Sequence, residues 1–283
     1  MEYSPKKLSD ILERHGFNFK KSFGQNFIVD ENIIDAIIYK SKITPNTLVL
    51  EIGPGAGALT YKLSEVAKNV LCFEIDTKLK PVLEELLKEK QNVEVVFEDF
   101  LTANVKEKLS SYTYEALYVV ANLPYYITTP IIMKLIEEKI PVSKIVIMVQ
   151  KEVGDRFKAS PGTKDYSSLS IFLNYYFEVK KLMDVSKHVF IPKPNVDSII
   201  IEMKKKETQR KVIDEEYFFK LIRDSFKQKR KTIKNNLKEY PLEIIEQVLK
   251  KNGFDLSVRA EQLSLDIFID IANSVSKGVC SND

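Results

Sequence analysis

The chain of 283 residues has few of the residue types that build metal centres and disulfide frameworks. Its two histidines and two cysteines form no cluster with the spacing of a zinc site, so we predict a protein without metal. Cys72 lies in a strand-like apolar run, where a buried free thiol is expected. A chain without a disulfide framework is typical of a reducing compartment.

Long apolar runs are absent as well. No uninterrupted apolar stretch approaches the roughly 18 to 20 residues that a membrane span needs. The polar N-terminal residues 1–7 lead into no apolar run, which argues against a secretory signal. The sequence therefore predicts a cytoplasmic protein that binds no membrane.

The chain does contain the alternating pattern of an α/β protein. With 44% hydrophobic and 29% charged residues it can bury a core. Short β-branched runs alternate with amphipathic stretches, which argues for βαβ units and a mainly parallel sheet. The expected strands are 47–52, 70–75, 93–97, 116–121 and 144–149, with helices over 59–67 and 78–88. Two further strands, 177–182 and 198–203, are expected at one edge of the sheet, joined by a loop with Pro192 and Pro194.

The pattern changes after residue 204. Helical apolar spacing recurs over 215–227, 242–251 and 265–274, and the charged segment 204–211 marks a boundary. We therefore predict a catalytic domain over residues 1–206 and a small all-helical domain over 207–283. Net charge is only +3, but residues 227–238 hold six basic residues and no acidic one. This run fits either a phosphate-binding surface or a solvated face of a basic helix.

The strongest local signal is a glycine-rich turn between an expected strand and an expected helix. Residues 51–57 read EIGPGAG, and such glycines permit a tight turn whose backbone a ligand can approach closely. Taken alone, this turn fits an ordinary strand-to-helix connection, a dinucleotide site or a methyl-donor site.

Acidic residues follow the next two expected strands. Glu74, 21 residues after Gly53, is placed to accept hydrogen bonds from both ribose hydroxyls of an adenosine-containing cofactor. Alone it would also fit a surface acid at a strand end. Asp99, just past the third strand, could accept from an adenine amino group. A glycine turn and two acids at three successive strand ends favour an adenosyl ligand.

The end of the fourth expected strand distinguishes between these cofactors. It reads Asn122-Leu123-Pro124-Tyr125, which is similar to the catalytic motif of amino-group N-methyltransferases. The N6 amine of adenine is a poor nucleophile because its lone pair is delocalised into the ring. Hydrogen bonds to the Asn122 side-chain oxygen and the Leu123 carbonyl could localise that lone pair. Pro124 would fix the turn and Tyr125 would stack on a base outside its helix. The structural alternative is that Asn122 caps the next helix and the aromatic residues are core.

Five segments together resemble the KsgA-type ribosomal RNA adenine dimethylase family over nearly the whole chain. They are residues 23–28 (FGQNFI), 51–60 (EIGPGAGALT), 122–129 (NLPYYITT), 150–156 (QKEVGDR) and 189–198 (VFIPKPNVDS). The resemblance implies a Rossmann-like class I methyltransferase sheet with a helical C-terminal domain, S-adenosyl-L-methionine as donor, and adenine N6 in RNA as acceptor. One departure is Ser167, at a position where the family often has glycine.

The resemblance also implies roles for individual residues. It implies donor binding by Gln25, Asn26, Ile28, Gly53, Gly55, Glu74, Ile75, Asp99, Phe100 and Asn122. It implies catalysis by Asn122, Leu123, Pro124, Tyr125 and Phe190, with Tyr125 and Phe190 as two faces of an aromatic clamp. For RNA binding we predict Lys227, Lys229, Arg230, Lys231 and Lys234.

Segments 128–130, 229–237 and 259–264 are similar to one branch of this superfamily. That branch dimethylates two adjacent adenosines near the 3′ end of small-subunit (16S) rRNA during ribosome assembly. The resemblance implies small-subunit rRNA and the assembling subunit as partners, and we expect a monomer. The alternatives are the large-subunit branch that confers macrolide resistance, an assembly factor acting mainly by binding, and a DNA adenine methyltransferase. The DNA methyltransferase alternative is weakened because the sequence contains no recognisable module for reading DNA bases.

Overall fold

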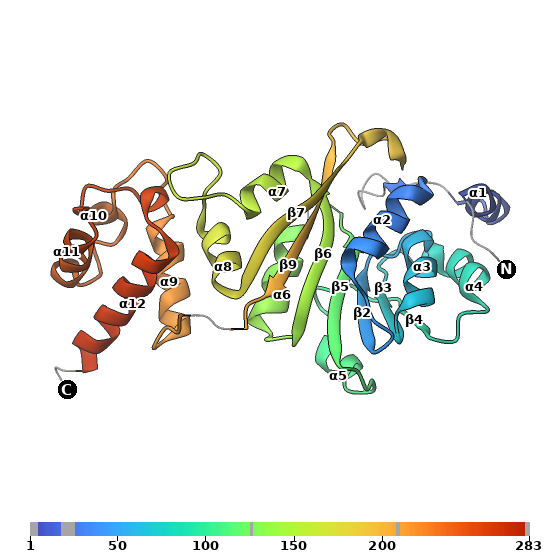
Figure 1. Ribbon diagram of the computed structural model, residues 1–283, viewed down its shortest axis with the longest axis horizontal. Coiled ribbons are helices and arrows are strands. Elements are labelled where there is room, and N and C mark those ends of the chain that lie inside the picture. Colours follow the sequence, from blue (N-terminus) through green and yellow to red (C-terminus); the bar gives the residue numbers. More distant parts are fainter. Residues whose placement is uncertain (1–4, 18–25, 125–126, 208–209, 281–283) are drawn as a thin grey trace. The chain divides into compact units, whose positions relative to one another are not determined.

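A computed structural model describes residues 5–17, 26–124, 127–207 and 210–280. Its centre is a seven-stranded sheet with the strand order β4-β3-β2-β5-β6-β9-β7 (Figure 1). Strands β2 to β6 pair in parallel and β9 pairs antiparallel to β6, so the predicted α/β class is confirmed. The strands are β2 Thr47–Ile52, β3 Asn69–Phe73, β4 Val93–Val96, β5 Ala116–Asn122, β6 Val142–Gln150, β7 Phe177–Val185 and β9 Ser198–Lys205.

Helices cover both faces of this sheet, which explains the continuous apolar strands. All six residues of β2 are buried, although successive side chains point to opposite faces. Val49 packs with Ile34 and Leu63 of the helices on one face, while Leu48 and Leu50 are buried on the other. The helices before residue 158 are α1 Pro5–Arg14, α2 Glu31–Ser41, α3 Ala58–Val66, α4 Lys80–Leu87, α5 Val105–Leu109, α6 Thr128–Glu137 and α7 Lys151–Phe157, with the 3-10 turn η2 at Thr77–Leu79.

The register of the parallel strands brings their carboxyl ends together. Ile52 pairs with Phe73, and Phe73 pairs with Val96. The residues that follow these strands therefore lie next to one another at one edge of the sheet. A second sheet has two strands, β1 Phe27–Ile28 and β8 Phe190–Ile191, which pair antiparallel. The 3-10 turn η3, Lys187–Val189, directly precedes β8.

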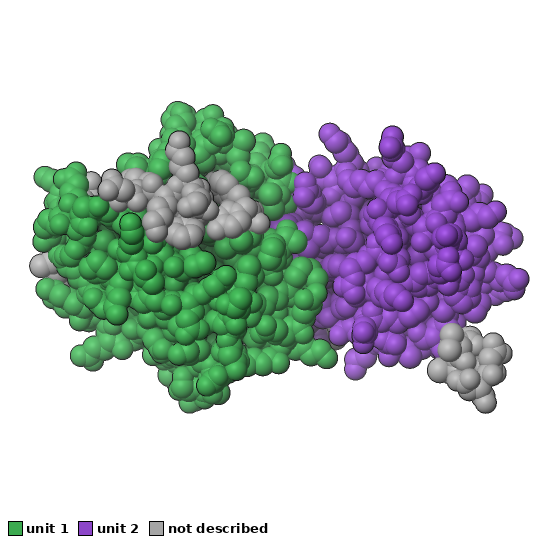
Figure 2. Space-filling model, turned by 180° about the vertical axis from the view of Figure 1, so that it is seen from behind, with its two compact units in different colours: residues 1–154, 180–204 green, residues 155–179, 205–283 purple. Residues whose placement is uncertain are grey.

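Two compact units divide the chain, Met1–Gly154 with Lys180–Lys204 and Asp155–Val179 with Lys205–Asp283 (Figure 2). Residues 155–179 thus belong with the C-terminal helices, whereas the predicted boundary placed them in the first domain. Aromatic contacts hold them there, with the rings of Phe172 and Phe219 centred 4.9 Å apart. The helices of this unit are α8 Ser168–Tyr176, α9 Glu215–Ser225, α10 Ile233–Asn236, α11 Leu242–Lys251 and α12 Leu265–Cys280, with η4 at Ala260–Gln262.

Ser167 begins α8 as its N-cap. Its backbone is extended, with φ −155°, so this position does not require glycine. Its side chain and that of Ser170 form a capping box, which satisfies N–H groups at the start of the helix. Serine is therefore well suited to position 167, where the family often has glycine.

No helix within the described residues is long and apolar enough to cross a membrane.

The predicted boundaries of α9 and α12 were slightly wrong: α9 ends at Ser225, and α12 continues past residue 274.

Candidate active site

The glycine turn between β2 and α3 adopts backbone angles that few other residues tolerate. Gly53, Gly55 and Gly57 have φ values of 70°, 58° and 86°, in the left-handed region. A Cβ atom on Gly55 would also lie 2.9 Å from the ring of Phe27. The turn therefore requires glycine for both its conformation and its packing.

Glu74, directly after β3, is tied to this turn. It is only 5% exposed, and its Oε2 accepts a hydrogen bond from the Gly55 N–H at 3.0 Å. Its Oε1 accepts from the Asp76 N–H at 2.8 Å. Burial raises the pKa of Glu74, and these N–H donors act in the opposite direction. A carboxylate can accept about four hydrogen bonds, so Glu74 retains capacity for a ligand.

Glu51 is a second buried acid at this edge, to which the sequence analysis gave no role. It is 1% exposed at the end of β2, and the Cys72 thiol donates to its Oε2 at 3.6 Å. Burial raises the pKa of Glu51 to about 8, so the carboxyl is mostly protonated at neutral pH. Its place as the first residue of the glycine motif was the signal that could have identified it.

The loop after β4 carries the second predicted acid. The Asp99 carboxylate accepts from the Leu101 N–H at 2.9 Å, which folds the loop back. Lys134 of α6 then donates to the carbonyls of Leu101 and Ala103, at 3.0 and 2.9 Å. These two hydrogen bonds from Lys134 hold the loop in place. The sequence did not predict them, because Lys134 is separated from Leu101 by 33 residues and from Ala103 by 31.

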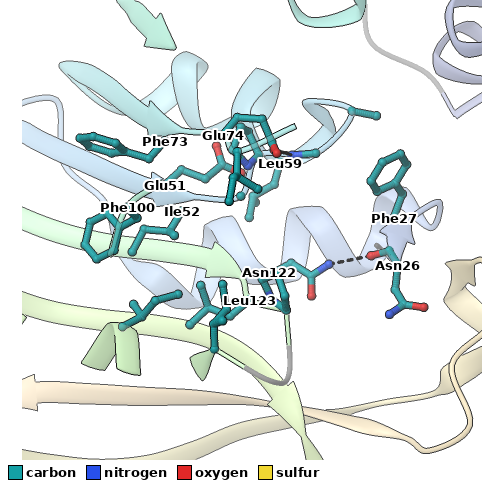
Figure 3. Close-up of a pocket in the computed structure, with 18 of the residues that line it drawn as sticks. Asn26, Phe27, Glu51, Ile52, Leu59, Phe73, Glu74, Phe100, Asn122 and Leu123 are labelled. Carbon is teal, nitrogen blue, oxygen red and sulfur yellow. Dashed lines mark hydrogen bonds between the residues drawn. The ribbon is translucent and has the colours of Figure 1, made fainter. Parts of the chain in front are cut away.

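Asn122 lies at the end of β5, and its amide is fixed by the main chain. Its Nδ2 donates to the Asn26 carbonyl oxygen at 2.9 Å (Figure 3). Since one end of the amide is used in this bond, its Oδ1 is the end left to accept a hydrogen bond. Leu123 and Pro124 follow, and the Pro124 carbonyl accepts a hydrogen bond from the Ile127 N–H at 3.2 Å.

These residues surround one cavity of about 330 Å³. Of the predicted site residues, it is lined by Asn26, Ile28, Gly53, Gly55, Glu74, Ile75, Asp99, Phe100, Asn122, Leu123 and Pro124. Gln25 and Tyr125 lie outside the described residues. Phe190 is 2% exposed in the core beside Ile28 and does not line the cavity, so its role in an aromatic clamp stays a prediction.

The charges of the cavity restrict what it can bind. Its titratable lining residues, within the part of the chain that the structure describes, are all acids: Glu51, Glu74, Glu98 and Asp99. The Gly55 N–H, which a diphosphate would need, is already used by Glu74. The cavity therefore suits an adenosyl ligand with positive charge better than a dinucleotide. No group of three or more His, Cys, Asp or Glu residues with metal-binding geometry exists among the residues described.

The predicted RNA-binding residues lie in the second unit and are exposed: Lys227, Lys229, Arg230, Lys231 and Lys234. The expectation of one basic helix was wrong. Residues 226–232 form the connection between α9 and α10, because α9 ends at Ser225 and the Lys231 N–H bonds the Gln228 carbonyl at 2.9 Å. Only Lys234 is in a helix.

The sheet order and the adenosyl-type cavity at its carboxyl edge define a class I methyltransferase. Comparison with known proteins narrows this class. The profile of the ribosomal RNA adenine dimethylase family matches residues 16–277, and the chain belongs to that family. S-adenosyl-L-methionine is accordingly its methyl donor.

Comparison with individual proteins agrees with this assignment to the family. The chain is 47% identical, over 96% of each chain, to the ribosomal RNA small subunit methyltransferases A of Bacillus cytotoxicus and Bacillus mycoides. Its fold is similar to that of a dimethyladenosine transferase from Plasmodium falciparum, with 28% identity, a TM-score of 0.72, and coverage of 89% of this chain and 98% of that one. It is also similar to the 23S rRNA methyltransferase ErmE, with 26% identity, a TM-score of 0.69, and coverage of 89% and 100%.

Proposed function

We propose that this protein dimethylates the N6 amino groups of two adjacent adenosines near the 3′ end of small-subunit (16S) rRNA, during ribosome assembly. The observation that carries the chemistry is the amide of Asn122, which lines an adenosyl-type cavity and donates its Nδ2 to the Asn26 carbonyl, so that Oδ1 is the end that can accept from an amine. The choice of subunit is supported by the identity to relatives named for the small subunit over almost the whole chain.

The residues of the cavity fit the donor. When bound, S-adenosylmethionine supplies an electrophilic methyl group on a positively charged sulfur. Glu74 would accept from the ribose hydroxyls, Asp99 would accept from the adenine amino group, and the exposed apolar side chain of Ile75 would cover the base. The glycine turn leaves room for the rest of the donor because Cβ atoms there would fill the space or strain the backbone.

The chain's own groups prepare the acceptor amine. Asn122 Oδ1 and the Leu123 carbonyl would accept the two N6 protons and direct the nitrogen lone pair out of the ring plane. Tyr125 would stack on the base after it leaves its helix. No strong general base is required, because the amine becomes acidic only after it has attacked the methyl group.

Transfer of labelled methyl from S-adenosylmethionine to unmethylated small-subunit particles, and in parallel to large-subunit particles, tests the proposal, followed by mapping of the modified nucleotides. We expect dimethyladenosine at two adjacent positions and no label in large-subunit rRNA. Label in large-subunit rRNA alone would assign the protein to the other branch. Tight particle binding without any label would support an assembly factor instead.

We further propose that the protein works as a cytoplasmic monomer. Cys72 is a buried free thiol, as suits a reducing compartment. Sedimentation of the purified protein at micromolar concentration should give one species near the chain mass of 32.6 kDa.

Lys134 gives a prediction about donor binding. We expect Lys134→Met to weaken donor affinity by about tenfold, because the loop that carries Asp99 and Phe100 loses two charge-assisted hydrogen bonds. Titration calorimetry with S-adenosylmethionine measures this. Glu138→Gln is the matched control, since it removes the 2.9 Å ion pair of Lys134 but leaves both carbonyl contacts. Equal affinities for the two variants would show that Lys134 does not support the donor site.

The basic segment gives a prediction about RNA binding. Neutralising Lys229, Arg230 and Lys231 to glutamine should lower affinity for the particle and flatten its dependence on salt. Each lost phosphate contact should reduce the log–log salt slope by about 0.9 on a duplex, or about 0.7 on a single strand. Filter binding across a salt series measures the slope, and donor affinity should not change.

The matched control for the basic segment is a triple variant of exposed lysines in the first unit, Lys88→Gln, Lys106→Gln and Lys139→Gln. It makes the same change in net charge. If both triple variants keep the wild-type slope, phosphate binding does not depend on residues 229–231. RNA docking would then have to rest on Lys20, Lys21 and the rim of the cavity.

A further inference from the structure

The main chain beside Asn122 determines which end of its side chain faces the substrate. The Asn26 carbonyl oxygen lies 2.9 Å from Asn122 Nδ2, although 96 residues separate the two in the sequence. Asn26 precedes β1, whose residues Phe27 and Ile28 are 8% and 4% exposed. The β1–β8 pair and a bond from the Val29 N–H to the Val189 carbonyl, at 2.9 Å, fix this segment.

A carbonyl oxygen can only accept a hydrogen bond, so the group opposite it must donate. An amide meets this condition with its NH₂ end and turns its oxygen the other way. An ionised carboxylate of the same shape would place oxygen against oxygen, without a proton between them. Such a partly buried contact is unfavourable, because two oxygens face each other without a hydrogen bond between them.

We propose that the Asn26 main-chain carbonyl orients the Asn122 amide for catalysis and makes this position specific for an amide over an ionised carboxylate. The part of this inference that concerns catalysis rests on the proposed function. Its structural part, the need for a hydrogen-bond donor opposite Asn26, stands independently. Asn26 thus acts as a positioning residue through its backbone.

Among the described residues that line the cavity with Asn122, no side chain carries a positive charge that would stabilise a negative charge in its place. The titratable side chains that line the same cavity, among the described residues, are Glu51 of β2, Glu74 after β3, and Glu98 and Asp99 after β4. From α6, Lys134 is engaged by two carbonyls and Glu138 and does not line the cavity. Before β8, Lys187 and His188 likewise lie outside the lining. A carboxyl introduced at position 122 should therefore hold its proton to higher pH than usual.

The variant Asn122→Asp tests this inference through its pH dependence. Protonated, the new carboxyl can donate to the Asn26 carbonyl and still accept from the substrate amine; ionised, it cannot donate. Single-turnover methyl transfer should therefore be slow at pH 8.5, close to that of Asn122→Ala. Relative to wild type, it should recover by up to about tenfold per pH unit as pH falls through the pKa of the new group. The ratio of Asn122→Ala to wild type should stay flat.

A second measurement needs no methyl transfer. Because the new carboxyl has a raised pKa in the folded protein, its ionisation disfavours the fold. The melting temperature of Asn122→Asp should therefore fall further below that of wild type as pH rises from about 4 to that pKa. The gap between Asn122→Ala and wild type should not follow this trend.

The two measurements separate the possible failures. Wild-type protein that transfers no methyl to rRNA, with the melting trend present, would overturn the proposed function and leave the orientation of Asn122 supported. An Asn122→Asp variant with wild-type activity at pH 8.5, or with a melting gap independent of pH, would overturn the inference.

Discussion

Replacing Asn122 by alanine is expected to slow methyl transfer by about a hundredfold or more at saturating donor and RNA. The proposed partner of its oxygen is the attacking amine, and loss of one positioned polar group that acts at the reaction centre typically costs this much. Single-turnover kinetics on unmethylated small-subunit particles measures the chemical step. Donor affinity, measured by calorimetry, should change much less than the rate.

Asn104→Ala is a suitable control for this variant. Asn104 caps α5 by accepting from the Glu107 N–H at 3.3 Å, and it does not line the cavity. Its replacement costs about 1 kcal/mol of stability through the lost cap, without an effect on the transfer rate. A wild-type rate for Asn122→Ala would remove this residue from the reaction centre.

Replacing Glu74 by alanine should weaken binding of S-adenosylmethionine by about a hundredfold. A hydrogen bond to a charged group contributes roughly 1.5 to 3 kcal/mol, and each 1.4 kcal/mol is a factor of about ten in affinity. The loss of binding free energy should be near the upper end of this range, since Glu74 also accepts a hydrogen bond from the Gly55 N–H and so supports the glycine turn. Titration calorimetry measures the affinity, and circular dichroism confirms that the variant is folded.

Glu98→Ala is the matched control for Glu74→Ala. Glu98 lines the same cavity but is exposed, so its loss should change affinity by no more than about threefold. Unchanged affinity in Glu74→Ala would mean that the ribose hydroxyls find another acceptor.

Much of this arrangement could be predicted because it depends on local sequence. The central strands are short, largely apolar runs, and a parallel sheet places their carboxyl ends at one edge whatever the details of packing. Gly53, Glu74 and Asp99 follow three such strands and Asn122 ends a fourth, and these four strands are neighbours in the sheet, which brings the residues to one cavity. Position and side-chain chemistry suggested roles for Glu74, Asp99 and Asn122, and the resemblance to a family implies the same roles.

The remaining features depend on contacts between distant residues. The β1–β8 pair involves two residues in each strand, which is too short for a periodic pattern, and it creates the Asn26–Asn122 bond. Residues 155–179 read as part of the first domain because their aromatic partners, such as Phe219, lie far along the chain. For the basic segment, a solvated face of one basic helix was one of the two alternatives, and it does not hold because α9 already ends at Ser225.

The titratable residues that line the cavity, among those described, are all acids, and this has a consequence for turnover. Dimethylation consumes two donors per adenosine, so a spent molecule must leave and a fresh one must enter between the transfers. Loss of the methyl group removes the positive charge on sulfur, and with it part of the attraction to Glu74, Glu98 and Asp99. We therefore expect the carboxylates that attract the charged donor to hold the product with its uncharged sulfur less tightly, which favours exchange of product for donor between the two transfers.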